Sequence, residues 1–172
     1  MSESRQRFPR RFGQVTSNPQ ITLDSTDRAI LALLLEDGRT TTADLARGVG
    51  LSPSATADRV RRLTDAGVIG GYTAVVEPAA LGHDVTAYIR LRFGPGRTAA
   101  FHEYLAGTPQ VLEAHHVTGE DCYLIKVVAG SMDHLEQLAS GLATYGHITT
   151  NVVFSSPVKP RPLSPGLQPA DV

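Results

Sequence analysis

Residues 40–72 read TTTADLARGVGLSPSATADRVRRLTDAGVIGGY, and this stretch decides the fold of the first part of the chain. Thr41 or Thr42 can cap a first helix, and Gly50 ends it because glycine readily takes the left-handed conformation found just past helix ends. Ser52 is then a second cap, strengthened by the proline that follows at the first helical position. The stretch therefore predicts two short helices joined by a tight turn.

The second of these helices has two chemically different faces. At about 100° per residue, Thr56, Val60 and Leu63 fall on one face, which can pack against the first helix. The other face is small, polar and partly cationic, as expected of a helix that lies in the major groove of DNA. The candidate DNA contacts are Thr42, Ser52, Ser54, Ala57, Asp58, Arg59, Arg61 and Arg62. Two helices of this kind also occur in domains that never touch DNA, so the pattern alone leaves that alternative open.

The residues on either side of this stretch complete a helical head. Asp24 is expected to cap a helix over residues 24–37, with Asp27 placed to return a hydrogen bond to the cap. Residues 68–76 have the character of a strand. Three helices followed by a strand predict a winged helix-turn-helix domain over residues 21–76.

The periodicity changes after a linker at residues 77–84. Strands are expected at residues 85–93, 111–117, 122–128 and 148–154, and helices at residues 98–106 and 131–145. The order βαββαβ predicts a ferredoxin-like domain over residues 85–157, so the fold class is α+β. Its helices would cover only one face of the sheet, and we expect a second subunit on the other face.

Composition excludes several classes of protein. The chain has 172 residues, a net charge of −1 and 41% hydrophobic residues, which are typical of a globular protein. The single cysteine, Cys122, excludes an intramolecular disulfide and a cysteine-rich zinc site. No apolar run approaches the ~20 residues needed to cross a bilayer, and no apolar signal core follows the first arginines. We therefore expect a cytoplasmic protein with no membrane partner, and DNA binding by the predicted helices would associate it with the nucleoid.

Charge is distributed unevenly along the chain. Residues 1–72 hold 10 Lys and Arg against 8 Asp and Glu, whereas residues 73–172 hold 6 against 9. Four of the arginines lie in residues 1–20, a polar arm interpreted as flexible, which can be a solvated tail or can reach DNA. Residues 158–172 are interpreted as a proline-rich tail.

Four runs of sequence carry a resemblance to a known family. They are LDSTDRAILALLLEDGR (23–39), LARGVGLSPSATADRVRRLTDAGVIGGYTAVVEPAALG (45–82), HHVTGEDCYLIKV (115–127) and NVVFSSPVK (151–159). In this order they resemble the Lrp/AsnC, or feast/famine, family of transcription regulators. The resemblance implies dimers, often assembled into tetramers or octamers, that bind palindromic promoter sites in double-stranded DNA. It also implies a C-terminal domain that binds a small-molecule effector, an amino acid or related metabolite.

The resemblance implies an effector site at the turn between the second and third strands of the C-terminal domain. Its candidate residues are Thr118, Gly119, Glu120, Asp121 and Cys122. Gly119 allows close approach to the backbone, and the acidic side chains can meet an α-amino group. Many relatives carry aspartate where Cys122 stands. If that aspartate contacts the effector, its role passes to Asp121 in this chain or is lost. Without the resemblance, a plain exposed hairpin turn remains an alternative.

Two positions depart from the family's usual residues. Asp58 stands where recognition helices often carry a basic or large residue, and Gly70 stands where an Arg or Lys is common. The Asp58 carboxylate would repel phosphate or accept a hydrogen bond from the N4 group of cytosine. We expect weaker nonspecific DNA binding as a result. Among the arginines, Arg61 is the better aimed at DNA, whereas Arg59 lies nearer the core.

The histidines of the C-terminal domain raise metal-binding and enzymatic alternatives to a regulator. His115 and His116 are adjacent in a predicted strand, point to opposite faces and cannot jointly chelate one ion. We therefore expect no metal and no cofactor other than the effector. The enzymatic alternative is a protein similar to the siroheme decarboxylases, which share this architecture and would use one of these histidines. A third alternative is a ligand-binding module with an idle head.

Overall fold

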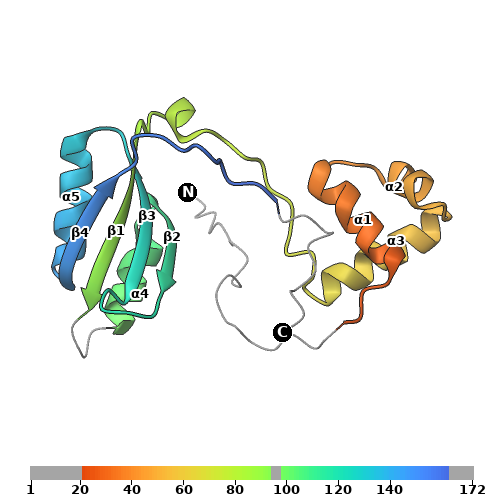
Figure 1. Ribbon diagram of the computed structural model, residues 1–172, viewed down its shortest axis with the longest axis horizontal. Coiled ribbons are helices and arrows are strands. Elements are labelled where there is room, and N and C mark those ends of the chain that lie inside the picture. The colour runs from red at the N-terminus through yellow and green to blue at the C-terminus, as the bar shows by residue number, and fades with distance from the viewer. Residues whose placement is uncertain (1–20, 94–97, 163–172) are drawn as a thin grey trace, which may run out of the picture. The chain divides into compact units, whose positions relative to one another are not determined.

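The computed structural model describes residues 21–93 and 98–162 of the chain. It divides into two compact units, which Figure 1 shows in cartoon form. Among the described residues, one unit holds 21–74 together with 159–162, and the other holds 75–93 and 98–158. The predicted arm at residues 1–20 and most of the predicted tail lie outside the described residues.

Three helices build the first unit: α1 (Ser25–Glu36), α2 (Thr42–Val49) and α3 (Pro53–Asp65). Each begins at a side chain that accepts a backbone N–H, which satisfies one of the unpaired donors of the first turn. Asp24 and Asp27 form a complete capping box at α1, as predicted. Thr41, the first of the two threonines considered, caps α2. Ser52 caps α3.

The core of this unit is small and comes from all three helices. Ile30, Leu45 and Leu63 are almost fully buried, one from each helix. Thr56 is buried beside them, and its hydroxyl donates to the Ser52 carbonyl at 3.0 Å, so the polar atom is satisfied. The predicted packing face of α3 is therefore confirmed at Thr56 and Leu63.

The strand predicted at residues 68–76 is absent from the structure, and that prediction was wrong. The N–H groups of Val68 and Ile69 both donate to the Leu63 carbonyl, so the chain closes α3 with a turn. Gly67 occupies the left-handed region of that turn, with φ of 71°. Val75 is 94% exposed. The sequence has the side chains of a strand here, but a strand also needs a neighbour for its backbone groups, and the described residues supply none.

The second unit is a four-stranded antiparallel sheet with two helices. The strands are β1 (Val85–Phe93), β2 (Val111–His116), β3 (Tyr123–Ala129) and β4 (Gly146–Val152), in the order β2-β3-β1-β4. Helix α4 (Thr98–Gly107) follows β1, and α5 (Met132–Ala143) follows β3. This is the predicted βαββαβ order. A short 3-10 helix, η1 (Pro78–Leu81), precedes the domain within the predicted linker.

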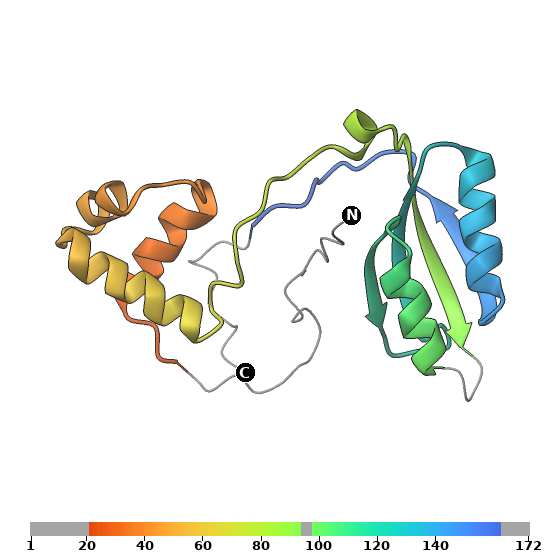
Figure 2. The same cartoon turned by 180° about the vertical axis from the view of Figure 1, so that it is seen from behind.

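The two helices lie on the same face of the sheet (Figures 1 and 2). On that face, Ala87, Ile89 and Leu91 of β1 are fully buried and alternate with exposed residues, as half-buried strands require. Phe101 of α4 packs edge-on against Tyr123 of β3, with ring centroids 4.9 Å apart. Within the described residues no helix covers the opposite face, which carries Tyr88, Arg90, Arg92, Glu113, His115 and Lys126.

Candidate nucleic-acid interface and effector pocket

The exposed side of α3 begins with small hydroxyl side chains. The Ser52 hydroxyl accepts from the Ala55 N–H at 3.2 Å and lies 3.1 Å from the Ser54 hydroxyl. Both serines are exposed at the N-terminal end of the helix, where the helix dipole favours a phosphate oxygen. Ala57 is half-buried, whereas Thr42 at the first position of α2 is exposed. The helix start is therefore small and open enough for close approach of a DNA backbone.

Arg61 and Asp58 form an ion pair on the exposed side of α3. The Arg61 Nη1 and Asp58 Oδ1 atoms are 3.2 Å apart, and each side chain is 69% exposed. The two residues are three apart in sequence, which brings their side chains together on a helix surface. The acid that would repel phosphate is thus partly neutralised by the arginine that was predicted to contact DNA.

The other two arginines of α3 are engaged by carboxylates of α1. Arg59 Nη1 donates to Asp24 Oδ2 at 2.7 Å and to Asp27 Oδ1 at 2.9 Å. Arg62 donates to the second Asp27 oxygen. Asp27 is fully buried, and a buried carboxylate needs this number of donors to offset its lost hydration. The expectation that Arg59 lies nearer the core is confirmed. Arg62 has the same kind of partner and keeps 48% of its side chain exposed.

Hydrogen bonds shift the pKa values of the groups at these helix starts. The pKa of Asp24 is lowered, chiefly by the Asp27 N–H that it accepts and then by Arg59. The pKa of Arg59 is raised by its hydrogen bonds to Asp24 and Asp27. In α2, the Thr41 hydroxyl and Arg47 lower the pKa of Asp44. These directions favour the charged forms of Asp24, Asp44 and Arg59.

The helical unit has no cationic excess of its own. Residues 21–74 contain six arginines, no lysine and seven Asp and Glu, so the excess of positive charge in the first part of the chain resides in residues 1–20. A broad basic surface cannot account for DNA recognition by these three helices.

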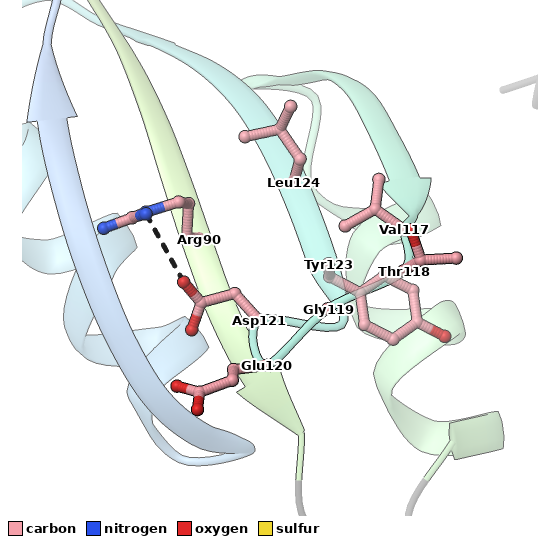
Figure 3. A pocket seen from close by; sticks show the side chains of 8 residues that line it. All are labelled: Arg90, Val117, Thr118, Gly119, Glu120, Asp121, Tyr123 and Leu124. Atoms are coloured by element: carbon pink, nitrogen blue, oxygen red, sulfur yellow. Dashed lines mark ion pairs between the residues drawn. The ribbon is translucent and has the colours of Figure 1, made fainter.

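A pocket lies at the turn between β2 and β3 (Figure 3). The Val117 N–H donates to the Cys122 carbonyl at 2.7 Å and closes the turn, in which Gly119 has a φ of 116° that glycine alone takes readily. The lining residues are Arg90, Val117, Thr118, Gly119, Glu120, Asp121, Tyr123 and Leu124. Four of the five predicted effector residues therefore line one pocket. Cys122 does not; it packs against the core of the sheet.

Both acids of the turn are paired with arginines of β1. Asp121 Oδ2 lies 3.6 Å from Arg90 Nη1 (Figure 3), and Glu120 Oε2 lies 2.5 Å from Arg92 Nη2. Sequence reasoning did not identify Arg90, which belongs to another strand. The register of the strands would have identified Arg90. It is opposite Leu124 of β3 and therefore lies beside the start of that strand, next to the turn.

The histidines take separate places, as predicted. His115 lies near Glu113 on the uncovered face, at 3.4 Å, whereas His116 stacks on Tyr123 with ring centroids 4.9 Å apart. Within residues 21–93 and 98–162, no three His, Cys, Asp or Glu side chains gather in a way that could hold a metal ion. None of the helices in this part of the chain is long and apolar enough to cross a membrane.

Comparison with known proteins agrees with both halves of this description. Residues 23–69 match the family model described as winged helix-turn-helix DNA-binding, and residues 86–163 match the Lrp/AsnC ligand-binding domain. The chain is 39% identical to the uncharacterized HTH-type transcriptional regulator YezC of Bacillus subtilis (strain 168), over 78% of this chain and 95% of YezC.

Solved structures of regulators have the same fold. E. coli AsnC superposes with a TM-score of 0.76 at 29% identity, covering 84% of this chain and 99% of AsnC. A transcriptional regulator from Neisseria meningitidis, solved as an L-Met complex, superposes with a TM-score of 0.74 at 29% identity, covering 81% of this chain and 94% of the other. These relatives are regulators, so the enzymatic alternative is set aside. The chain belongs to the Lrp/AsnC family of DNA-binding transcriptional regulators.

Proposed function

We propose that this regulator binds a palindromic site in double-stranded DNA as a homodimer or larger assembly, and that an amino acid or related metabolite alters its DNA binding or assembly. The observation that carries the proposal is the pairing of Arg90 with Asp121 beside Gly119 in one pocket. An α-amino acid carries a carboxylate and an ammonium group on the same carbon atom. Arg90 and Asp121 complement these groups, because the guanidinium can bind the carboxylate of the amino acid and the Asp121 carboxylate can bind its ammonium group.

The strength and exposure of this ion pair suit exchange with a ligand. At 3.6 Å the pair is looser than the 2.5 Å pair of Arg92 and Glu120. The Arg90 and Asp121 side chains are 50% and 28% exposed, so both remain accessible. Val117 and Leu124 add apolar surface at the same place, which suits an aliphatic effector side chain. The L-Met complex of the Neisseria meningitidis regulator supports this class of effector.

The proposed function also covers oligomer formation and the role of each segment of the chain. The helix-free face of the sheet supports pairing through a second copy of the domain. We assign residues 21–76 to DNA binding, 77–84 to the linker and 85–157 to effector binding and assembly, flanked by the basic arm at 1–20 and the tail at 158–172. Ser52, Ser54 and Arg61 are the proposed DNA contacts with open side chains, with Thr42, Ala57 and Asp58 beside them. The proposed location is the cytoplasm, in association with the nucleoid.

Calorimetric titration of the full chain with each of the twenty amino acids tests the effector site. We expect one amino acid, or a small group of similar ones, to bind. Its N-acetyl derivative and its methyl ester should both fail to bind, because each removes one charge. Asp121→Asn and Arg90→Gln should weaken binding by about tenfold or more, the loss of one charge-assisted hydrogen bond.

Arg92→Gln is the matched control, because Arg92 is paired with the turn but does not line the pocket. Its affinity for the same amino acid should stay within about twofold of the unaltered chain. Equal losses in Arg92→Gln and Arg90→Gln would place the effector elsewhere.

A further inference from the structure

The three arginines of α3 fall into two groups with different partners. Arg59 and Arg62 are tied to carboxylates at the start of α1, Arg59 to the exposed Asp24 and the buried Asp27 and Arg62 to Asp27. Arg61 is tied to Asp58, on the exposed side of the same helix. The outward pair is therefore one anion and one cation, which is an unusual surface for a helix that meets a polyanion. A paired acceptor and donor on this side of the helix can read a base pair.

We propose that Asp58 and Arg61 together read one C·G base pair in the major groove, and so fix a position of the DNA site. Cytosine presents its N4 amino group as a donor there, and guanine presents O6 and N7 as acceptors. The Asp58 carboxylate accepts from N4, and the Arg61 guanidinium donates to O6 and N7. The two side chains keep their mutual contact, because a carboxylate has lone pairs for both donors and a guanidinium has five N–H groups.

The geometry of the pair fits a single base-pair edge. Residues three apart on a helix have Cβ atoms about 5–6 Å apart, and the carboxylate and guanidinium of this pair already meet at 3.2 Å. Both side chains are 69% exposed, so neither must leave a buried site to reach the groove. Ser54 lies on the same side, one turn nearer the helix start, where its hydroxyl can position the helix on the backbone.

Asp58 makes base recognition selective, because its carboxylate disfavours base pairs that present no hydrogen-bond donor to it. At a T·A pair the carboxylate would face the O4 acceptor and the methyl group of thymine, and it would lose its water without gaining a donor. Over a phosphate it would be repelled. Asp58 therefore lowers affinity for unrelated DNA, while the C·G pair alone offers a donor for the carboxylate on one base and two acceptors for the guanidinium on the other.

Selection of duplexes from a random pool by the full chain tests this inference. We expect each half of the selected site to contain one invariant C·G pair. Asp58→Ala and Arg61→Ala should each lose preference at that position by about tenfold or more and keep the others. Asp58→Asn should shift the preferred cytosine towards adenine, since a carboxamide pairs with the N6 and N7 atoms of adenine. Asp58→Ala should also bind unrelated DNA more tightly.

Asp65→Ala provides the matched control, because Asp65 is an exposed acid at the last position of the same helix. It should leave the selected sequence unchanged. An unchanged base preference in Asp58→Ala would overturn the inference and leave the pair as solvated surface, and so would a selected site without an invariant C·G pair. A pool from which the unaltered chain selects nothing would overturn sequence-specific binding itself, a result distinct from these. Thermal melting of each variant verifies that the helical unit is folded.

Discussion

Arg62 of α3 donates a hydrogen bond to the buried carboxylate of Asp27 at the start of α1, across 35 residues of sequence. Asp27 thereby holds two arginines of α3, since Arg59 bonds its other oxygen. The same residue completes the capping box with Asp24. One carboxylate therefore fixes the start of α1 and the orientation of the helix that carries the proposed DNA contacts.

Asp27→Asn should destabilise the helical unit by about 2–3 kcal/mol. The amide keeps the size of the side chain but removes the charge, so two arginines lose a buried anionic partner. Urea unfolding followed by circular dichroism measures the change. Asp58→Asn makes the same substitution in an exposed ion pair and should change the free energy of unfolding by less than about 0.5 kcal/mol. Equal effects of the two substitutions would show that the Asp27 contacts contribute little.

Arg61→Ala and Arg62→Ala should separate DNA affinity from stability. Arg61→Ala should weaken binding to the preferred duplex by about tenfold or more, as expected for a lost base contact, and the slope of log affinity against log salt should change by less than the ~1 expected for a lost phosphate contact. Its thermal midpoint should stay unchanged, because the side chain is exposed. Arg62→Ala should lower the midpoint, because it leaves Asp27 with one arginine. If Arg61→Ala kept both the affinity and the salt slope of the unaltered chain, Arg61 would not contact DNA.

Gly119→Asp should abolish the response to the effector and preserve DNA binding. The φ of 116° at Gly119 strains any other residue, and the added carboxylate would occupy the pocket beside Asp121. Duplex affinity with and without the effector measures the response. Gly82→Ala is the control, since Gly82 also has positive φ, at 79°, but does not line the pocket. A normal response in Gly119→Asp would move the effector site away from this turn.

Acid should destabilise the helical unit through Asp24 and Asp44. Both carboxyl groups have a pKa below the ordinary value of 3.8, because they accept hydrogen bonds in the folded state. A lowered pKa contributes stability that is fully present above the unfolded value and is lost as the pH falls through the folded value. The free energy of unfolding should therefore be independent of these groups between pH 6 and about 8 and should fall below pH ~4. Asp24→Asn should make that decline shallower, and an identical decline would contradict the assignment.

Features formed by residues close together in the sequence were predicted correctly more often than contacts between residues far apart in the sequence. The caps Asp24 and Ser52 act on residues three positions away, so the sequence displays both partners together. The strand predicted at residues 68–76 failed because its side-chain pattern says nothing about whether a partner strand is present. Arg90 was missed for a related reason, since only the sheet register brings it to the β2–β3 turn.

The DNA-contact residues show the same limit. Helical periodicity correctly separated Arg61, on the exposed side, from Arg59, near the core. It gave no indication that Arg62 is bound to a carboxylate of α1, because that carboxylate lies 35 residues earlier in the chain. The division of the arginines between stability and recognition therefore required the packed helices.

The central claim is that a small molecule controls sequence-specific DNA binding by this chain. The most direct measurement is a titration of the full chain with the duplex found upstream of its own gene and with a scrambled duplex, at two salt concentrations, with and without a pooled set of amino acids. We expect preference for the upstream duplex and a change in that affinity when the pool is added. Equal, weak binding to both duplexes that the pool does not alter would contradict it.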